Sequence, residues 1–259
     1  MMAHNNGITL AWSRRGAGDP VLLIHGLGYA RWGWEPIEPI LAKHFSVITF
    51  DNRGIGESDV PAGPYTAAEM AEDAIAVLDA AGVRRAHVVG TSLGGMIAQE
   101  VAIAHPERVD RLVLLSTTPG GPDAHPMPEA TTRLLTEAQT MAPAEALESF
   151  VRNALGPRPD ERVVERIMSH RLRSPQDPDG WAAQAAAGTT YDGSGRAVQI
   201  GHPTLVVTGD ADNVVDPDNA ALLCSQIPNA RSVLVPGTGH LPFWERPRTV
   251  ADLIIEFLS

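Results

Sequence analysis

The sequence predicts an α/β fold in which helices cover both faces of a mostly parallel central sheet. Short, continuous apolar runs rich in β-branched residues recur along the chain, as is typical of strands buried on both faces. Amphipathic stretches of helical length alternate with these runs, as the crossovers of a parallel sheet require. The chain has 259 residues, of which 44% are apolar, so it can bury one substantial core.

The first half of the chain carries the clearest alternation of strand and helix. Thr66 and Glu69 have the spacing of a capping box at the start of one helix, which Gly82 ends. A second helix begins after residue 92 and stops at His105-Pro106, because proline disfavours a helical residue before it. The strands expected in this half are residues 21–24, 45–50, 86–89 and 112–115.

Residues 119–199 interrupt this alternation. Strand-like runs are absent, prolines and glycines punctuate the segment, and several amphipathic stretches follow one another. Strands are expected again at 204–208 and 232–235, with helices near 218–227 and 249–258. We therefore predict a core of residues 1–118 and 200–259, interrupted by a helical insertion of residues 119–199. The helical segments of the insertion are 129–141, 144–155, 161–172 and 181–187.

The charge balance argues against several classes of partner. The chain has 20 Lys and Arg against 31 Asp and Glu, a formal charge of −11, which repels nucleic acid and anionic membranes. The single cysteine, Cys224, excludes an internal disulfide and a thiolate metal cluster. The first residues show no secretory signal and no apolar stretch is long enough to span a bilayer, so we expect a cytoplasmic protein.

The segment Gly90-Thr91-Ser92-Leu93-Gly94 lies where an expected strand passes into a helix. This Gly-x-Ser-x-Gly pattern is typical of a nucleophile elbow, in which a strained turn exposes the serine hydroxyl above the sheet. The two flanking glycines allow the strand and the helix to pass closely. Ser92 is therefore the candidate nucleophile.

A serine nucleophile needs a histidine base and a carboxylate that orients it. His240 follows the expected strand at 232–235 in a Gly-Thr-Gly-His segment, and Asp212 follows the strand at 204–208. Asp210 and Asp216 lie in the same region and remain alternatives, although turn formation also explains them. The order Ser92, Asp212, His240 is nucleophile, acid, base.

The segment His25-Gly26-Leu27-Gly28 follows the expected strand at 21–24. A glycine-containing turn at this point can direct backbone N–H groups toward a developing oxyanion. We assign the backbone amides of Leu27 and Leu93 to an oxyanion hole, in which each donor contributes about 3 kcal/mol to transition-state stabilisation. His25 itself is expected to brace the turn.

In these motifs the chain resembles members of the α/β-hydrolase superfamily. Within the superfamily it is most similar to small bacterial enzymes related to 3-oxoadipate enol-lactonases and carboxylesterases. The resemblance covers nearly the whole chain, and it implies a Ser-His-Asp triad and a helical cap inserted between two core strands. It does not specify the substrate. The matching segments are 25–28, 51–58, 90–95, 203–212 and Gly239-His240, with Glu245 and Pro247 downstream.

The sequence contains no complete motif for binding a nucleotide cofactor or a catalytic zinc ion. Gly54-Ile55-Gly56 follows a strand, but position 59 is Asp, so the third glycine of a dinucleotide-binding pattern is missing. The chain contains no phosphate-binding loop motif and no His-Glu-x-x-His pattern. A metal held by His25, Asp212 and His240 would compete with the triad for two of its members. We expect neither a cofactor nor a metal.

The substrate pocket is expected between the elbow and the insertion, because ligands bind at the carboxyl ends of parallel strands. Arg31 and Arg53 could contact a substrate carboxylate, although bracing of turns is the favoured role for both. Trp34 is expected to pack in the core. The candidate pocket residues are Trp32, Met127, Trp181, Tyr191 and Phe243.

The leading hypothesis is a serine hydrolase that cleaves a small carboxylic ester or lactone through an acyl-enzyme on Ser92. A C–C bond hydrolase acting on a vinylogous diketone could use the same triad and remains an alternative. A ligand-binding sensor on a retained hydrolase fold is the alternative from another functional class. The residue pattern leaves a homo-oligomer open and does not identify the substrate.

Overall fold

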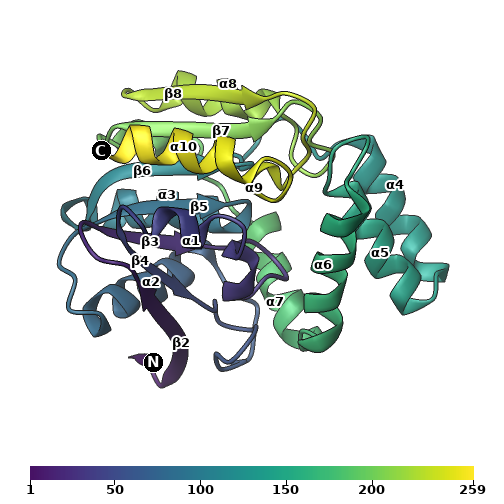
Figure 1. The fold of residues 1–259 in the computed structure, drawn as a ribbon, viewed down its shortest axis with the longest axis horizontal. Helices are drawn as coiled ribbons and strands as arrows, with labels where there is room; N and C mark the ends of the chain where they lie inside the picture. Colours follow the sequence, from purple (N-terminus) through teal and green to yellow (C-terminus); the bar gives the residue numbers. More distant parts are fainter.

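The computed structural model describes all residues, 1–259, and is built around one eight-stranded sheet (Figure 1). The strand order is β1-β2-β4-β3-β5-β6-β7-β8, in which β3 to β8 are parallel and the first two strands are antiparallel at one edge. The strands are β1 (Met2–Asn5), β2 (Ile8–Arg15), β3 (Pro20–Ile24), β4 (Ser46–Phe50), β5 (Ala86–Thr91), β6 (Val109–Leu115), β7 (Thr204–Gly209) and β8 (Ala230–Val235).

All six strands expected from the apolar runs are present, and the structure adds β1 and β2. These two strands form a hairpin whose turn is Asn6-Gly7, with φ angles of 48° and 84°. Asn-Gly is the strongest sequence signal for a two-residue hairpin turn, because both positions require positive φ. The added hairpin extends the parallel sheet at its β4 edge through antiparallel pairing of β2.

Successive residues of a strand point alternately into two hydrophobic layers, one on each face of the sheet. In β3, Leu22 and Ile24 join the layer formed with α2 (Ala67–Ala80), α3 (Leu93–Ala104) and α8 (Asp218–Gln226). Val21 and Leu23 join the opposite layer, which includes residues of α1 (Glu38–Leu41), α9 (Pro242–Glu245) and α10 (Pro247–Leu258). The predicted capping box of Thr66 and Glu69 is confirmed at the start of α2.

Four helices lie between β6 and β7, within the segment expected to be a helical insertion. In Figure 1, α4, α5 and α6 stand beside the sheet at the ends toward which the strand arrows point. No helix of the chain is both long and apolar enough to cross a bilayer. The four helices are α4 (Glu129–Glu137), α5 (Pro143–Asn153), α6 (Glu161–Arg173) and α7 (Pro178–Thr189).

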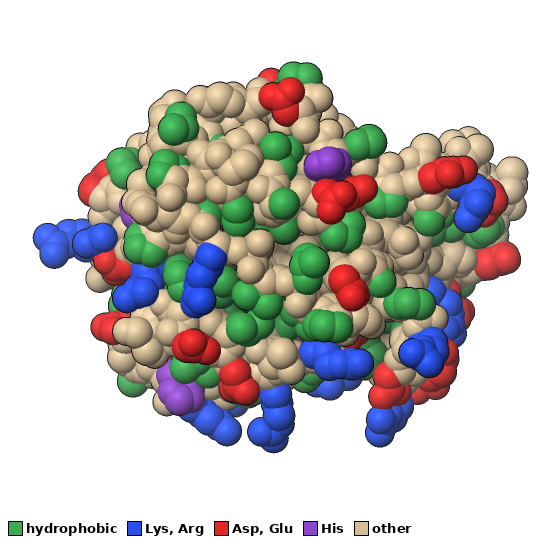
Figure 2. All heavy atoms as spheres, turned by 90° about the horizontal axis from the view of Figure 1, so that it is seen from above, with side chains coloured by type: hydrophobic (Ala, Val, Ile, Leu, Met, Phe, Trp, Pro, Cys, Tyr) green, Lys and Arg blue, Asp and Glu red, His purple; other side chains and the backbone are tan.

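Charged side chains of both signs are mixed on the face of the molecule that Figure 2 shows. On the face shown in Figure 2, acidic and basic side chains are interspersed with apolar and neutral ones. Many of the cations are paired, as in the contacts of Arg108 with Asp79 and Arg152 with Glu161.

Candidate active site

Ser92 occupies a strained turn between β5 and α3. Its backbone angles are φ 55° and ψ −123°, a conformation that L-residues rarely adopt. The Ser92 N–H donates to the Leu115 carbonyl at 2.9 Å, and its own carbonyl accepts from the Thr117 hydroxyl at 2.7 Å. These contacts with the end of β6 and the residues after it hold the turn.

The glycines on either side of Ser92 are needed because backbones pass too closely for a side chain. A Cβ atom on Gly94 would overlap the carbonyl oxygen of Ile24 at the end of β3. A Cβ atom on Gly90 would overlap the carbonyl oxygen of Gly94. The Gly-x-Ser-x-Gly spacing is thus dictated by the packing of strand against helix.

Asp212 and His240 lie together, although 28 positions separate them in the sequence. Asp212 Oδ2 is 2.8 Å from His240 Nδ1, and both side chains are buried. Asp212 Oδ1 accepts from the N–H groups of Val214 and Val215 at 2.8 and 3.0 Å. The carboxylate is therefore fixed on one side by backbone donors and faces the imidazole on the other.

The two alternative acids have other partners. Asp210 accepts the N–H of Gly237 at 2.7 Å and so braces the turn after β8. Asp216 accepts the N–H of Asp218 at 2.9 Å at the start of α8. Of the three candidates, the geometry places only Asp212 against His240.

The loop that carries His240 is tied to the end of α5 by Glu245. Glu245 Oε2 accepts the Gly239 N–H at 2.7 Å, and Oε1 accepts the Gly156 N–H at 2.9 Å. Burial raises the pKa of the Glu245 carboxyl, and the two amide hydrogen bonds oppose that shift. The sequence showed Glu245 only as a residue of the matching pattern, because its partner at Gly156 is distant along the chain.

The amides proposed for the oxyanion hole are free of acceptors within the chain. Leu93 is the first residue of α3, where N–H groups have no intrahelical partner, and Leu27 lies in the turn after β3. Asn52 donates to the His25 carbonyl at 2.8 Å and holds this turn from the adjacent loop. Leu27 and Ser92 line the same cavity, so the free Leu27 donor is beside the candidate nucleophile.

His25 braces the turn from below as a buried aromatic ring. It stacks on Tyr29 at 4.7 Å, and its Nδ1 accepts the Gly26 N–H at 2.8 Å. Burial, and secondarily the neighbouring His240, lowers the pKa of His25 to about 3. The ring is therefore neutral at physiological pH and is suited to packing.

The lowered pKa of His25 predicts that the folded protein loses stability as the pH falls. In the unfolded chain His25 takes up a proton near its ordinary pKa of about 6.5. Between that value and about 3 the unfolded chain binds the extra proton, so this residue lowers the free energy of unfolding by about 1.4 kcal/mol per pH unit as pH falls. Urea unfolding of the wild type and of His25→Gln at pH 4 to 7 measures how the free energy of unfolding of each protein changes with pH. The stability difference between the two proteins should narrow toward low pH, and parallel curves would contradict the assignment.

A cavity of about 200 Å³ is lined by two of the three candidate catalytic residues, Ser92 and His240. Ser92, His240 and Leu27 line its core side, and side chains from the helices between β6 and β7 line the other. The lining is mostly apolar and includes Leu147, Phe150 and Val151 of α5. The dimensions and lining suit a small, largely apolar group next to a polar reacting centre.

Of the five expected pocket residues, only Trp181 lines this cavity. Trp32 instead stacks on His170 at 4.7 Å, and Phe243 is fully buried against Trp34. Tyr191 packs in the hydrophobic layer with α2 and α3, whereas Met127 is 46% exposed. Aromatic packing in the core accounts for most of these differences, and Trp34 packs there as expected.

The two arginines weighed for a substrate carboxylate are both paired with buried aspartates. Arg31 Nε contacts Asp51 at 3.2 Å, and Arg53 Nε contacts Asp73 at 2.6 Å. The arginine that does line the cavity is Arg171 of α6, which the sequence did not single out. Its position depends on how α6 faces the core, and periodicity alone does not give that.

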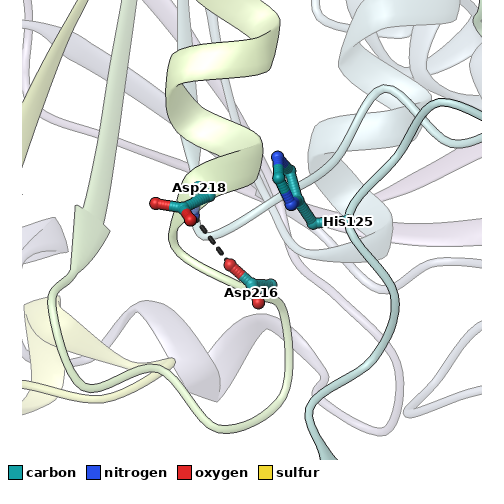
Figure 3. A group of neighbouring side chains, drawn as sticks. All are labelled: His125, Asp216 and Asp218. Carbon is teal, nitrogen blue, oxygen red and sulfur yellow. Dashed lines mark hydrogen bonds between the residues drawn. The ribbon is translucent and has the colours of Figure 1, made fainter.

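His125, Asp216 and Asp218 form a separate group whose side chains come close enough to share a cation (Figure 3). Asp218 is the first residue of α8, Asp216 lies two residues before it, and His125 belongs to the loop before α4. Asn219 donates to the His125 carbonyl and accepts its N–H, so it holds this loop against α8. The hydrogen bond from the Asp218 N–H to Asp216 and this loop contact account for the arrangement.

The comparisons with known proteins agree with the fold. The family model described as alpha/beta hydrolase fold matches residues 19–247. “Putative non-heme bromoperoxidase BpoC” of Mycobacterium tuberculosis is 32% identical over 261 aligned positions, which cover 97% of this chain and 98% of the relative. The structure of a hydrolase from Pseudomonas aeruginosa PA01 is 33% identical with a TM-score of 0.86, covering 100% of this chain and 98% of that one.

A second solved structure is that of Est816, described as an N-acyl homoserine lactone degrading enzyme. It is 30% identical with a TM-score of 0.85, and the match covers 99% of this chain and 100% of Est816. The family model and the full-length solved structures thus agree with the fold described above. The chain belongs to the α/β hydrolase fold family.

Proposed function

We propose that the protein is a serine hydrolase that cleaves a small carboxylic ester or lactone through an acyl-enzyme on Ser92. The observation that carries this proposal is the buried Asp212–His240 hydrogen bond beside a cavity lined by both His240 and Ser92. A serine, an oriented imidazole and free backbone donors are the elements that acyl transfer requires.

Each group has a defined part in the proposed reaction. His240 takes the Ser92 hydroxyl proton as the oxygen attacks the carbonyl carbon, and the Leu27 and Leu93 amides stabilise the negative oxygen of the tetrahedral intermediate. His240 then protonates the departing alkoxide, and the acyl group remains on Ser92. Water, deprotonated by His240, attacks the acyl-enzyme and releases the carboxylic acid. Asp212 holds the imidazolium throughout.

The cavity and the relatives support an ester or lactone as the substrate. The apolar lining has room for a short acyl group, and the cavity has no carboxylate that would repel the oxyanion. The resemblance to a protein described as degrading acyl homoserine lactones points in the same direction.

A substrate panel tests the proposal. We expect the wild type to release acid continuously from some members of a series of short-chain esters and lactones, measured by pH-stat titration. The uncatalysed rate of each compound is the control. Release of one equivalent per chain, with no further product, would instead indicate a ligand-binding sensor and overturn the proposed turnover.

A further inference from the structure

Arg171 places a cation in the catalytic cavity. It extends from α6, and its Nη1 donates to the Gly28 carbonyl at 2.5 Å. The guanidinium also lies 5.2 Å from the centre of the Tyr29 ring. Gly28 directly follows Leu27, whose amide belongs to the proposed oxyanion hole. The charge is thus held beside the turn that faces the reacting carbonyl.

The charge of Arg171 is not balanced within the protein. Two other arginines of α6 have carboxylate partners, since Arg162 pairs with Asp160 and Arg166 with Glu35, each at 2.7 Å or less. Arg171 has only the backbone carbonyl and the aromatic ring. The residues that line the cavity include neither Asp nor Glu. An uncompensated cation in a mostly apolar cavity favours a negatively charged ligand.

We propose that Arg171 is a specificity-determining residue that binds a carboxylate on the substrate, so the preferred substrate is an ester or lactone that also carries a free carboxylate. A guanidinium has five N–H groups, and the Gly28 contact uses one of them, which leaves donors for a planar carboxylate. The contact with Gly28 fixes the guanidinium before the ligand arrives. This inference rests on the proposed hydrolase function.

Paired substrates that differ only in charge test the inference. Monomethyl and dimethyl glutarate place the carboxylate on the acyl side, and 3-acetoxybenzoate and its methyl ester place it on the leaving group. For each compound kcat/KM is measured with the wild type, Arg171→Met and Arg171→Lys. Arg173→Met is the matched control, because this exposed neighbour on the same helix loses the same charge and bonds only to Ser169.

We expect the wild type to prefer the anionic member of at least one pair. Arg171→Met should lower kcat/KM for that anionic ester by about ten- to a hundredfold, the effect of losing one charge-assisted contact, and should change its neutral partner by less than about threefold. Arg171→Lys should restore part of the preference, and Arg173→Met should retain it.

Two results would overturn the inference. An equal loss for charged and neutral esters in Arg171→Met would show that Arg171 only braces the oxyanion turn. The absence of a charge preference in the wild type for both pairs would exclude the carboxylate subsite. In either case hydrolysis of the neutral esters would leave the proposed function intact, whereas failure to hydrolyse any ester or lactone would count against that function itself.

Discussion

Ser92→Ala should lower ester turnover by about ten thousandfold or more and should abolish covalent labelling by a fluorophosphonate. In the proposed mechanism the variant removes the atom that forms the acyl-enzyme, and the oxyanion donors and the cavity alone leave a small residual rate. Steady-state kinetics on the best ester of the panel, together with intact-mass analysis after labelling, measure both effects.

The fold should persist in Ser92→Ala, because the contacts of the elbow are made by backbone atoms of residue 92. Circular dichroism and the thermal midpoint of the variant are the control for folding. A folded Ser92→Ala protein with wild-type turnover would show that another group is the nucleophile. A folded variant that still forms the adduct would locate the reactive atom elsewhere in the chain.

The elements that were predictable from the sequence are those whose pattern has a local physical cause. The parallel strands are buried on both faces and therefore appear as continuous apolar runs, as in residues 21–24 of β3. The capping box at Thr66 depends on a contact with a residue three positions away. The glycines of the elbow are required by the packing of one strand against one helix. Strand β2 begins with two half-buried residues and ends in the polar Ser13-Arg14-Arg15, of which the two arginines are exposed, so it does not appear as a continuous apolar run.

The side chains that line the cavity were harder to predict, because their position depends on contacts between distant segments. Nothing in the sequence separates Arg31 and Arg53 from Arg171, but in the structure the first two pair with the buried carboxylates of Asp51 and Asp73. Trp32 and Phe243 are aromatic residues close to active-site segments, yet both have aromatic partners elsewhere. Helical periodicity identified the helices of the insertion without specifying which side of α6 meets the cavity.

Asp212→Asn should lower kcat by about ten thousandfold with little change in fold. The reason is that the two carboxylate oxygens of Asp212 have different partners. Oδ1 accepts the N–H groups of Val214 and Val215, so an asparagine must place its amide oxygen there. Its NH2 group then faces His240 Nδ1, where the carboxylate oxygen Oδ2 now lies at 2.8 Å.

In Asp212→Asn the two nitrogens of the His240 imidazole therefore exchange their roles as hydrogen-bond donor and acceptor. With a donor opposite Nδ1, this nitrogen must accept, and the ring proton moves to Nε2, the atom that has to take the proton from Ser92. KM should change little, because Asp212 lies behind the imidazole and is not among the residues lining the cavity. The loss should therefore appear in kcat under saturating substrate.

Asp210→Asn provides a matched comparison, since it removes the same charge two residues away. Asp210 accepts a single N–H from Gly237 in an exposed turn, and an amide oxygen can preserve that hydrogen bond. We expect kcat of Asp210→Asn to remain within about threefold of wild type, because no proton on His240 is displaced. Equal losses in the two variants would mean that charge near the loop, and not the tautomer of His240, controls the rate. A large loss confined to Asp210→Asn would assign the orienting acid to Asp210 and require the loop after β7 to rearrange during catalysis.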